Sequence, residues 1–159
     1  MVELIHENVY YRDGQLLTEQ ELAAQGVKAD RAEGVKKTLA YQVMEAHQQG
    51  SGMEDLHLKF DALTSHDITY VGIIQTAIAS GLDHFPIPYI LTNCHNSLAA
   101  VGGTINEDDH VFGLSAVKRF GGLYVPPHMA VIHEYMRERM AGGGKMIPVS
   151  YTHLRAHET

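Results

Sequence analysis

Cysteine is nearly absent from this chain of 159 residues, which contains only Cys94. A single cysteine excludes an internal disulfide and agrees with a reducing compartment. It also means that these residues alone cannot hold an iron–sulfur cluster through several thiolates.

Positive charge and long apolar runs are also scarce. The chain has 12 Lys and Arg against 19 Asp and Glu, a net charge of −7, so it has no electrostatic footprint for nucleic acid or an anionic membrane. No apolar run approaches the roughly 20 residues needed to span a bilayer. The N-terminus is charged from Glu3 onward, unlike a secretory signal. We therefore expect a cytoplasmic chain with a small-molecule or protein partner.

Several common catalytic motifs are missing as well. The sequence contains no phosphate-binding loop, no H-E-x-x-H and no C-x-x-C. Ser97 is the one serine in a nucleophile-like setting, and it lacks the G-x-S-x-G elbow. No single short motif therefore identifies the chemistry.

The end of the chain lacks a usable hydrophobic pattern. Residues 149–159 read VSYTHLRAHET, which has neither a helical nor a strand period. Read back into codons, they match the transposon end and adapter of sequencing libraries, and Pro148 fits the junction. We interpret residues 148–159 as a non-native, adapter-derived tail without specific packing, and we expect the natural chain to continue past Ile147.

What is present is an alternation of strand and helix patterns from about residue 56 onward. A strand is predicted within residues 55–65, where Leu56, Leu58 and Phe60 alternate with polar residues, and Asp67 is placed to cap a buried helix that Gly81 ends. Further along, the pattern predicts a strand within residues 85–95, a helix over 107–122, a strand over 123–125, a helix over 129–144 and a strand beginning at 145–147. This alternation predicts an α/β fold, with a mostly parallel sheet flanked by helices.

The segment before residue 50 has a weaker pattern. Thr18 and Glu21 have the spacing of a capping box, which predicts a short helix after Thr18. Residues 31–49 predict a single amphipathic helix, whose apolar stripe includes Val35 and Leu39.

Polar side chains gather in four segments that follow predicted strands or begin predicted helices, where open α/β sheets bind ligands. The segments are residues 65–69, 92–97, 107–110 and 125–133. Each also has an ordinary structural interpretation. Asp67 can be a helix cap, residues 107–110 can be a solvated first helical turn, and His133 can be a core histidine beside a methionine stripe.

Taken in order, these segments resemble the N-terminal domain of the aconitase family over about residues 56–147. The first, SHDITYVGIIQTAIASGL, resembles the Q-D-A-T block at the start of a buried helix in that family. Asp67 and Thr69 match the block, and His66 stands where the family has glutamine.

Two later blocks extend the resemblance. LTNCHNSL resembles the H-C-D-H-L block, with Cys94 matching. VPPHMAVIHEYM is similar to the P-G-S-G-I-I-H block, with Pro127 and His133 at the same separation. In the family, a strand carrying G-[ST]-D-S-H-T follows this helix, and GGGKMI runs directly to where that strand would begin.

The resemblance implies a hydro-lyase that removes water reversibly from a hydroxy acid, here a diverged hydratase without an identified substrate. It implies a [4Fe-4S] cluster in the full-length parent and none in this fragment, because the family's cluster cysteines lie further along the chain. We therefore expect the fragment to be inactive without the missing C-terminal domains. The implied organisation is a partial N-terminal aconitase-like domain over residues 1–147, followed by the tail over 148–159.

The resemblance also implies roles for individual residues. His133 is an implied catalytic residue, as are His95 and Asn96, which stand where the family has an Asp-His pair that protonates the leaving hydroxyl. No metal ligand is assigned in this chain. We expect Asp67, Thr69, His95 and His133 to converge at the carboxyl edge of the sheet, with His66 nearby. Three residues are implied to bind substrate: His66, Asp67 and Thr69.

The alternative is a metal-dependent hydrolase. Zinc or a similar ion would require at least three histidine or aspartate side chains to converge within bonding distance. The candidate ligands are His66, Asp67, His95, His110 and His133.

Overall fold

The computed structural model describes residue 4 and residues 6–94 and 104–150. The chain divides into two compact units, Met1–Ala46 and His47–Thr159. Among the described residues, no helix has both the length and the apolarity needed to cross a membrane.

The first unit is a β-hairpin followed by short helices. Strand β1 (Val9–Arg12) pairs antiparallel with β2 (Gln15–Thr18). The turn residues Asp13 and Gly14 both have positive φ, 51° and 84°, as the favoured two-residue hairpin turns require. Sequence reasoning missed this hairpin, although Asp-Gly is a strong signal for it. The helices of the unit are α1 (Glu19–Ala24), α2 (Arg31–Lys36) and α3 (Leu39–His47).

The capping box at Thr18 is confirmed. The Glu21 amide donates to Thr18 Oγ1, and the Thr18 amide donates to the Glu21 carboxylate. The single helix predicted over residues 31–49 is wrong, because the Thr38 hydroxyl accepts a hydrogen bond from the Tyr41 amide and α3 starts afresh after α2.

The second unit contains a four-stranded parallel sheet with the order β5-β4-β3-β6. Its helices are α4, α5 and α6, and a π-helical turn, η1 (Met136–Met140), continues α6. The predicted α/β architecture, a parallel sheet flanked by helices, is confirmed at this level. The strands are β3 (Leu63–His66), β4 (Tyr89–Thr92), β5 (Leu123–Val125) and β6 (Val149–Ser150), and the helices are α4 (Asp67–Ala79), α5 (Ile105–Phe120) and α6 (Ile132–Tyr135).

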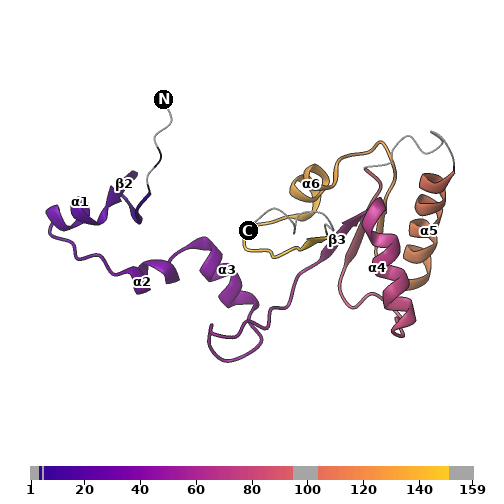
Figure 1. The fold of residues 1–159 in the computed structure, drawn as a ribbon, viewed down its shortest axis with the longest axis horizontal. Coiled ribbons are helices and arrows are strands. Elements are labelled where there is room, and N and C mark those ends of the chain that lie inside the picture. Colours follow the sequence, from indigo (N-terminus) through magenta and orange to yellow (C-terminus); the bar gives the residue numbers. More distant parts are fainter. Residues whose placement is uncertain (1–3, 5, 95–103, 151–159) are drawn as a thin grey trace. The chain divides into compact units, whose positions relative to one another are not determined.

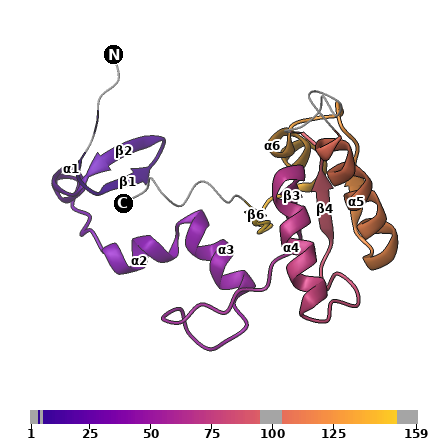
Figure 2. The ribbon, with the colours of Figure 1, turned by 45° about the vertical axis from the view of Figure 1, so that its right-hand side comes forward.

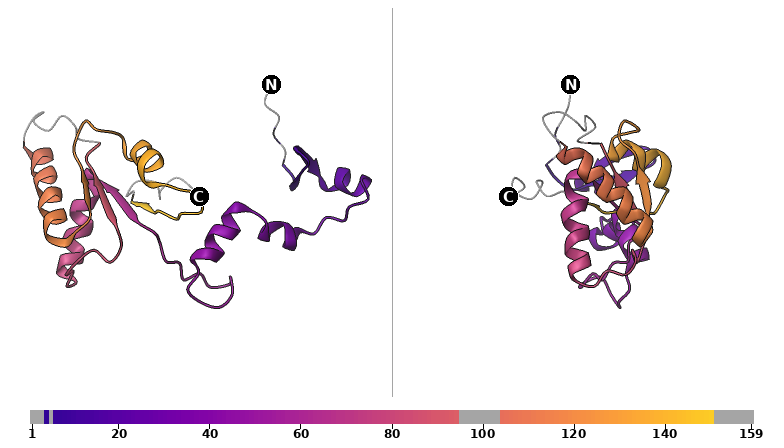
Figure 3. Two further views of the ribbon diagram at one scale, coloured as in Figure 1. Left: turned by 180° about the vertical axis from the view of Figure 1, so that it is seen from behind. Right: turned by 90° about the vertical axis from the view of Figure 1, so that its right-hand side faces the viewer.

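The helices cover both faces of this sheet. Leu91 packs with the buried residues of α4 and α5, whereas its neighbour Ile90 packs with Ile132 and Met136 of α6 and η1. Because successive strand residues point to opposite faces, α4 and α5 form one layer and α6 the other (Figure 1). Figure 2 shows α4 alongside β3 and β4, and Figure 3 shows the same layers from behind.

The order in which strands are added to the sheet reverses between β3 and β6. The chain runs outward from β3 to β4 and β5 through α4 and α5, and then returns through α6 to place β6 on the other side of β3. In open parallel sheets, ligands bind outside the carboxyl ends of the strands at such a switch point. The carboxyl end of β3 is therefore the first place to look for a site, whereas β6 belongs to the residues interpreted as a non-native tail.

The strand predicted within residues 55–65 forms only at the end of that segment. The alternating residues Leu56, Leu58 and Phe60 lie before it, and Leu58 makes an isolated β-bridge with Gln48. The strand itself is β3 at Leu63–His66. Three of its four residues are polar and fully buried, so a search for alternating apolar residues passes over it.

Helix α4 also differs from the expectation that it is buried all round. Ile68, Ile73 and Ile78 are exposed, and the buried side of the helix includes Tyr70 and Ile74. Its N-cap is His66, and Asp67 is the first helical residue instead of the cap.

The expectation that residues 148–159 make no specific packing is wrong for residues 148–150. The Thr64 amide donates to the Pro148 carbonyl at 3.1 Å, and Val149 and Ser150 pair with Thr64 and Ser65. The ladder uses backbone groups, so the edge of β3 accepts a strand largely irrespective of its side chains. Residues 151–159 lie outside the described residues.

Deleting residues 148–159 should lower the melting temperature by several degrees. Each lost ladder bond contributes about 1 kcal/mol, and that energy shifts melting by roughly 4 °C in a domain of this size. Differential scanning calorimetry measures the shift. The matched control deletes residues 151–159 alone and should melt above the longer deletion. An unchanged melting temperature in the longer deletion would show that β6 contributes nothing.

Asp61 links the start of the second unit to the segment before β6. Asp61 Oδ2 lies 2.8 Å from His47 Nε2 and accepts the Met146 amide at 2.7 Å. The Met146 hydrogen bond, followed by that of His47, lowers the pKa of Asp61. A lowered folded-state pKa means that the ionised carboxylate stabilises the fold.

Asp61→Asn should therefore lower the free energy of unfolding near pH 7. The stabilisation by Asp61 is fully present above the unfolded-state pKa of about 4 and is lost as the pH falls through the lower folded-state value. Urea titrations across this range should show the wild-type advantage disappearing in acid. Asp83→Asn, at a carboxylate that is 97% exposed, is the control, and an equal loss there would contradict the prediction.

Candidate functional site

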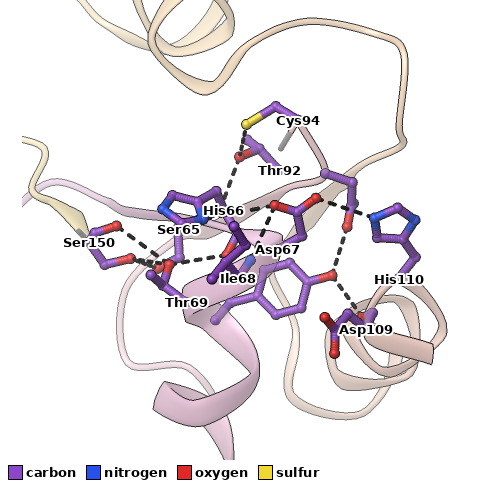
Figure 4. A network of polar contacts seen from close by, with 12 residues as sticks. Ser65, His66, Asp67, Ile68, Thr69, Thr92, Cys94, Asp109, His110 and Ser150 are labelled. Atoms are coloured by element: carbon purple, nitrogen blue, oxygen red, sulfur yellow. Dashed lines mark hydrogen bonds and ion pairs between the residues drawn. The ribbon is translucent and has the colours of Figure 1, made fainter. Parts of the chain in front are cut away.

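A cluster of polar side chains lies where β3, β4 and β6 end. His66 and Thr92 are paired in the sheet, and Ser65 is paired with Ser150, so the carboxyl ends of these strands lie together. Figure 4 shows Asp67 at the centre of the cluster, with His66 and His110 on either side.

Asp67 is the most enclosed charged group of the cluster, with no exposed surface. Its Oδ1 accepts the Ile68 amide at 3.2 Å and lies 3.9 Å from His66 Nδ1. Its Oδ2 lies 3.3 Å from His110 Nε2. Burying a carboxylate is costly unless it is paired and hydrogen-bonded, and here the N-terminus of α4 and two imidazoles surround it.

Thr69, one turn into α4, closes the other side of the cluster. Its hydroxyl lies 3.1 Å from the His66 carbonyl oxygen, and 3.1 Å from Ser150 Oγ. Thr69 thus joins the end of β3 to the end of β6 at the switch point.

The end of β4 brings Cys94 next to the start of α6. Cys94 Sγ lies 3.9 Å from Thr92 Oγ1 and is hydrogen-bonded to the backbone of Ile132. Burial raises the pKa of the Cys94 thiol, which favours the protonated form over the thiolate that binds metals.

The sequence-predicted site residues are only partly brought together. His66, Asp67 and Thr69 share one buried cluster. His133 is in α6, and its side chain is exposed, so its interpretation as a core histidine is wrong. His95 and Asn96 lie outside the described residues, and the expected convergence of all the site residues stays a prediction.

The sequence analysis did not group His110, Tyr70 and Asn93 with Asp67. His110 was expected in a solvated helical turn, but it is only 6% exposed and faces Asp67. The Tyr70 hydroxyl lies 2.7 Å from Asn93 Oδ1 and 2.8 Å from the Asp109 carbonyl oxygen. Asn93 Nδ2 in turn donates to the Val125 carbonyl. Tyr70 follows Asp67 by three positions, and this helical spacing was the available signal.

Metal binding has no complete ligand set in the described part of the chain. No three His, Cys, Asp or Glu side chains gather there as metal ligands would, and His95 lies outside it. A groove of about 750 Å³ belongs to the first unit and is lined by residues between Asn8 and Thr38, none of them a predicted site residue.

No family model, curated protein or solved structure matches this chain. The cluster must therefore be interpreted from its own geometry.

Gly113→Ala should disturb this cluster. A Cβ at Gly113 would lie 2.5 Å from Tyr70 Oη, and forcing atoms into a packed interior costs about 1–3 kcal/mol. That cost exceeds the roughly 0.5–1 kcal/mol that alanine gains over glycine in a helix. Urea denaturation should therefore show a net loss of stability.

Gly72→Ala is the matched control, because a Cβ there meets nothing within 4 Å. It should be neutral or stabilise the chain by about 0.5–1 kcal/mol. If both variants gain stability, the packing of Tyr70 against α5 is looser than the structure indicates.

Proposed function

We propose that this chain comes from the N-terminal domain of an aconitase-like hydratase, a hydro-lyase acting on a small hydroxy acid. The observation that carries the proposal is the position of Asp67 and Thr69 at the carboxyl end of β3, where His66 pairs with Thr92 at the end of β4. The three segments that resemble blocks of the family lie at the ends of β3, β4 and β5, in the order in which those blocks occur in the family. Open parallel sheets bind small ligands at this edge.

A second contact supports the proposal. The hydrogen bond between Cys94 and the backbone of Ile132 brings the end of β4 to the residue before His133. The His133 side chain is exposed, and an exposed imidazole can exchange protons with a ligand.

The proposed reaction needs one base and one acid. Dehydration removes a proton from a carbon next to a carboxylate, breaks the neighbouring C–OH bond, and leaves a C=C bond. The departing hydroxyl takes up a proton and leaves as water, because hydroxide is a poor leaving group. His133 is our candidate to move one of these protons. His95, with Asn96 beside it, is our candidate for the other.

The iron–sulfur cluster that the resemblance implies does not fit the residues of this chain. The chain has one cysteine, whose thiol pKa is raised by burial, whereas a [4Fe-4S] cluster needs several thiolates. We therefore assign the iron–sulfur cluster to other residues of the parent protein, and the acid and base roles above do not depend on it. By itself the chain is proposed to be inactive.

In the parent protein, His133→Ala should lower turnover by roughly two to four orders of magnitude, the usual loss for a positioned acid or base. The assay follows formation or loss of the conjugated alkene acid by ultraviolet absorbance over a panel of hydroxy acids. Circular dichroism should show an unchanged fold.

His84→Ala is the matched control, since His84 is 75% exposed and lies outside the cluster. It should retain wild-type turnover. A parent protein that hydrates no member of the panel, or a His133→Ala variant with full activity, would overturn the proposed function.

A further inference from the structure

Asp67 lies between two buried histidines that come from different parts of the chain. The exposed fractions are 1% for His66, none for Asp67 and 6% for His110. Oδ1 of the carboxylate lies 3.9 Å from His66 Nδ1, and Oδ2 lies 3.3 Å from His110 Nε2. Because both oxygens belong to one planar group, any rotation of the carboxylate changes both distances together.

We propose that His110 is a positioning residue, which fixes the Asp67 carboxylate and, through it, the ring of His66. The proposal rests on the proposed function in one respect, namely that His66 binds the hydroxy acid. It assigns His110 no contact with the substrate.

The orientation of the carboxylate depends on contacts at both oxygens, and His110 makes one of them. The Ile68 amide donates to Oδ1, so this oxygen is held by the N-terminus of α4 itself. Oδ2 has His110 as its partner across the α4–α5 interface. Without the imidazole, Oδ2 would be a buried acceptor that loses this interaction, and the carboxylate would turn to recover one.

The orientation of the carboxylate matters for the chemistry of His66. A carboxylate facing Nδ1 favours a proton on that nitrogen, and this in turn decides whether Nε2 accepts or donates a hydrogen bond. A binding residue for a hydroxy acid must present one defined tautomer, since a carboxylate requires a donor and a hydroxyl can use either. His110 would thus set the binding properties of a residue that it does not touch.

The packing of α4 against α5 does not depend on His110 alone. The Tyr70 hydroxyl on α4 contacts the Asp109 carbonyl oxygen on α5 and the Asn93 side chain after β4. His110→Gln should therefore fold, and it removes the ring nitrogen that faces Oδ2 of Asp67.

The test is nuclear magnetic resonance of the chain labelled with ¹⁵N-histidine, in which long-range ¹H–¹⁵N correlations distinguish the tautomers. In the wild type, His66 should show predominantly the Nδ1-protonated form when neutral. In His110→Gln the ratio of this tautomer to the other should fall about fivefold or more, because a carboxylate about 4 Å away biases the proton strongly. Asp67→Asn should give the same change, and His84→Gln should give none.

Two results would overturn the proposal. One is a wild-type His66 that is mainly protonated on Nε2, which needs no variant to observe. The other is a folded His110→Gln chain with an unchanged His66 tautomer ratio. Neither result involves turnover, so an inactive parent protein would refute the proposed function and leave this pairing intact.

Discussion

The second unit depends on a strand of polar residues buried at the centre of its sheet. Thr64, Ser65 and His66 of β3 have almost no exposed surface, so each polar group must be satisfied within the protein. The Thr64 hydroxyl donates to the Ile90 carbonyl, and Ser65 Oγ lies 2.6 Å from the Tyr89 hydroxyl. These contacts restrict the register of β3 against β4, because a shift of one residue would move the hydroxyls to the opposite face.

The sequence pattern was sufficient where apolar burial determines the element. Strand β4 is fully buried, β5 is short but preceded by glycines, and α5 has acidic residues in its first turn and basic residues in its last, so all three were predicted close to their positions. The capping box at Thr18 was also predicted, because its energetics are local to four residues. The aconitase-like interpretation, by contrast, rests on the order and spacing of short blocks and stays a proposal.

The pattern failed where tertiary contacts determine the outcome. Leu56 and Leu58 alternate as a strand would, yet the sheet takes the polar segment after them, since its hydroxyls have partners there. His110 looked like part of a solvated turn because its partner lies 43 positions earlier in the chain. Backbone pairing at the edge of β3 is likewise invisible in the side chains of Val149 and Ser150.

The candidate site therefore depends on the packing of α4 against α5 as much as on the residues that form it. Gly113 lets α5 approach Tyr70 closely, and this approach brings His110 to the carboxylate at the start of α4. A larger residue at Gly113 would separate the helices and leave Asp67 buried with fewer partners, which is costly for a charge. The close contact between Gly113 and Tyr70 thus both stabilises the packing of α4 against α5 and sets the position of His110 beside Asp67.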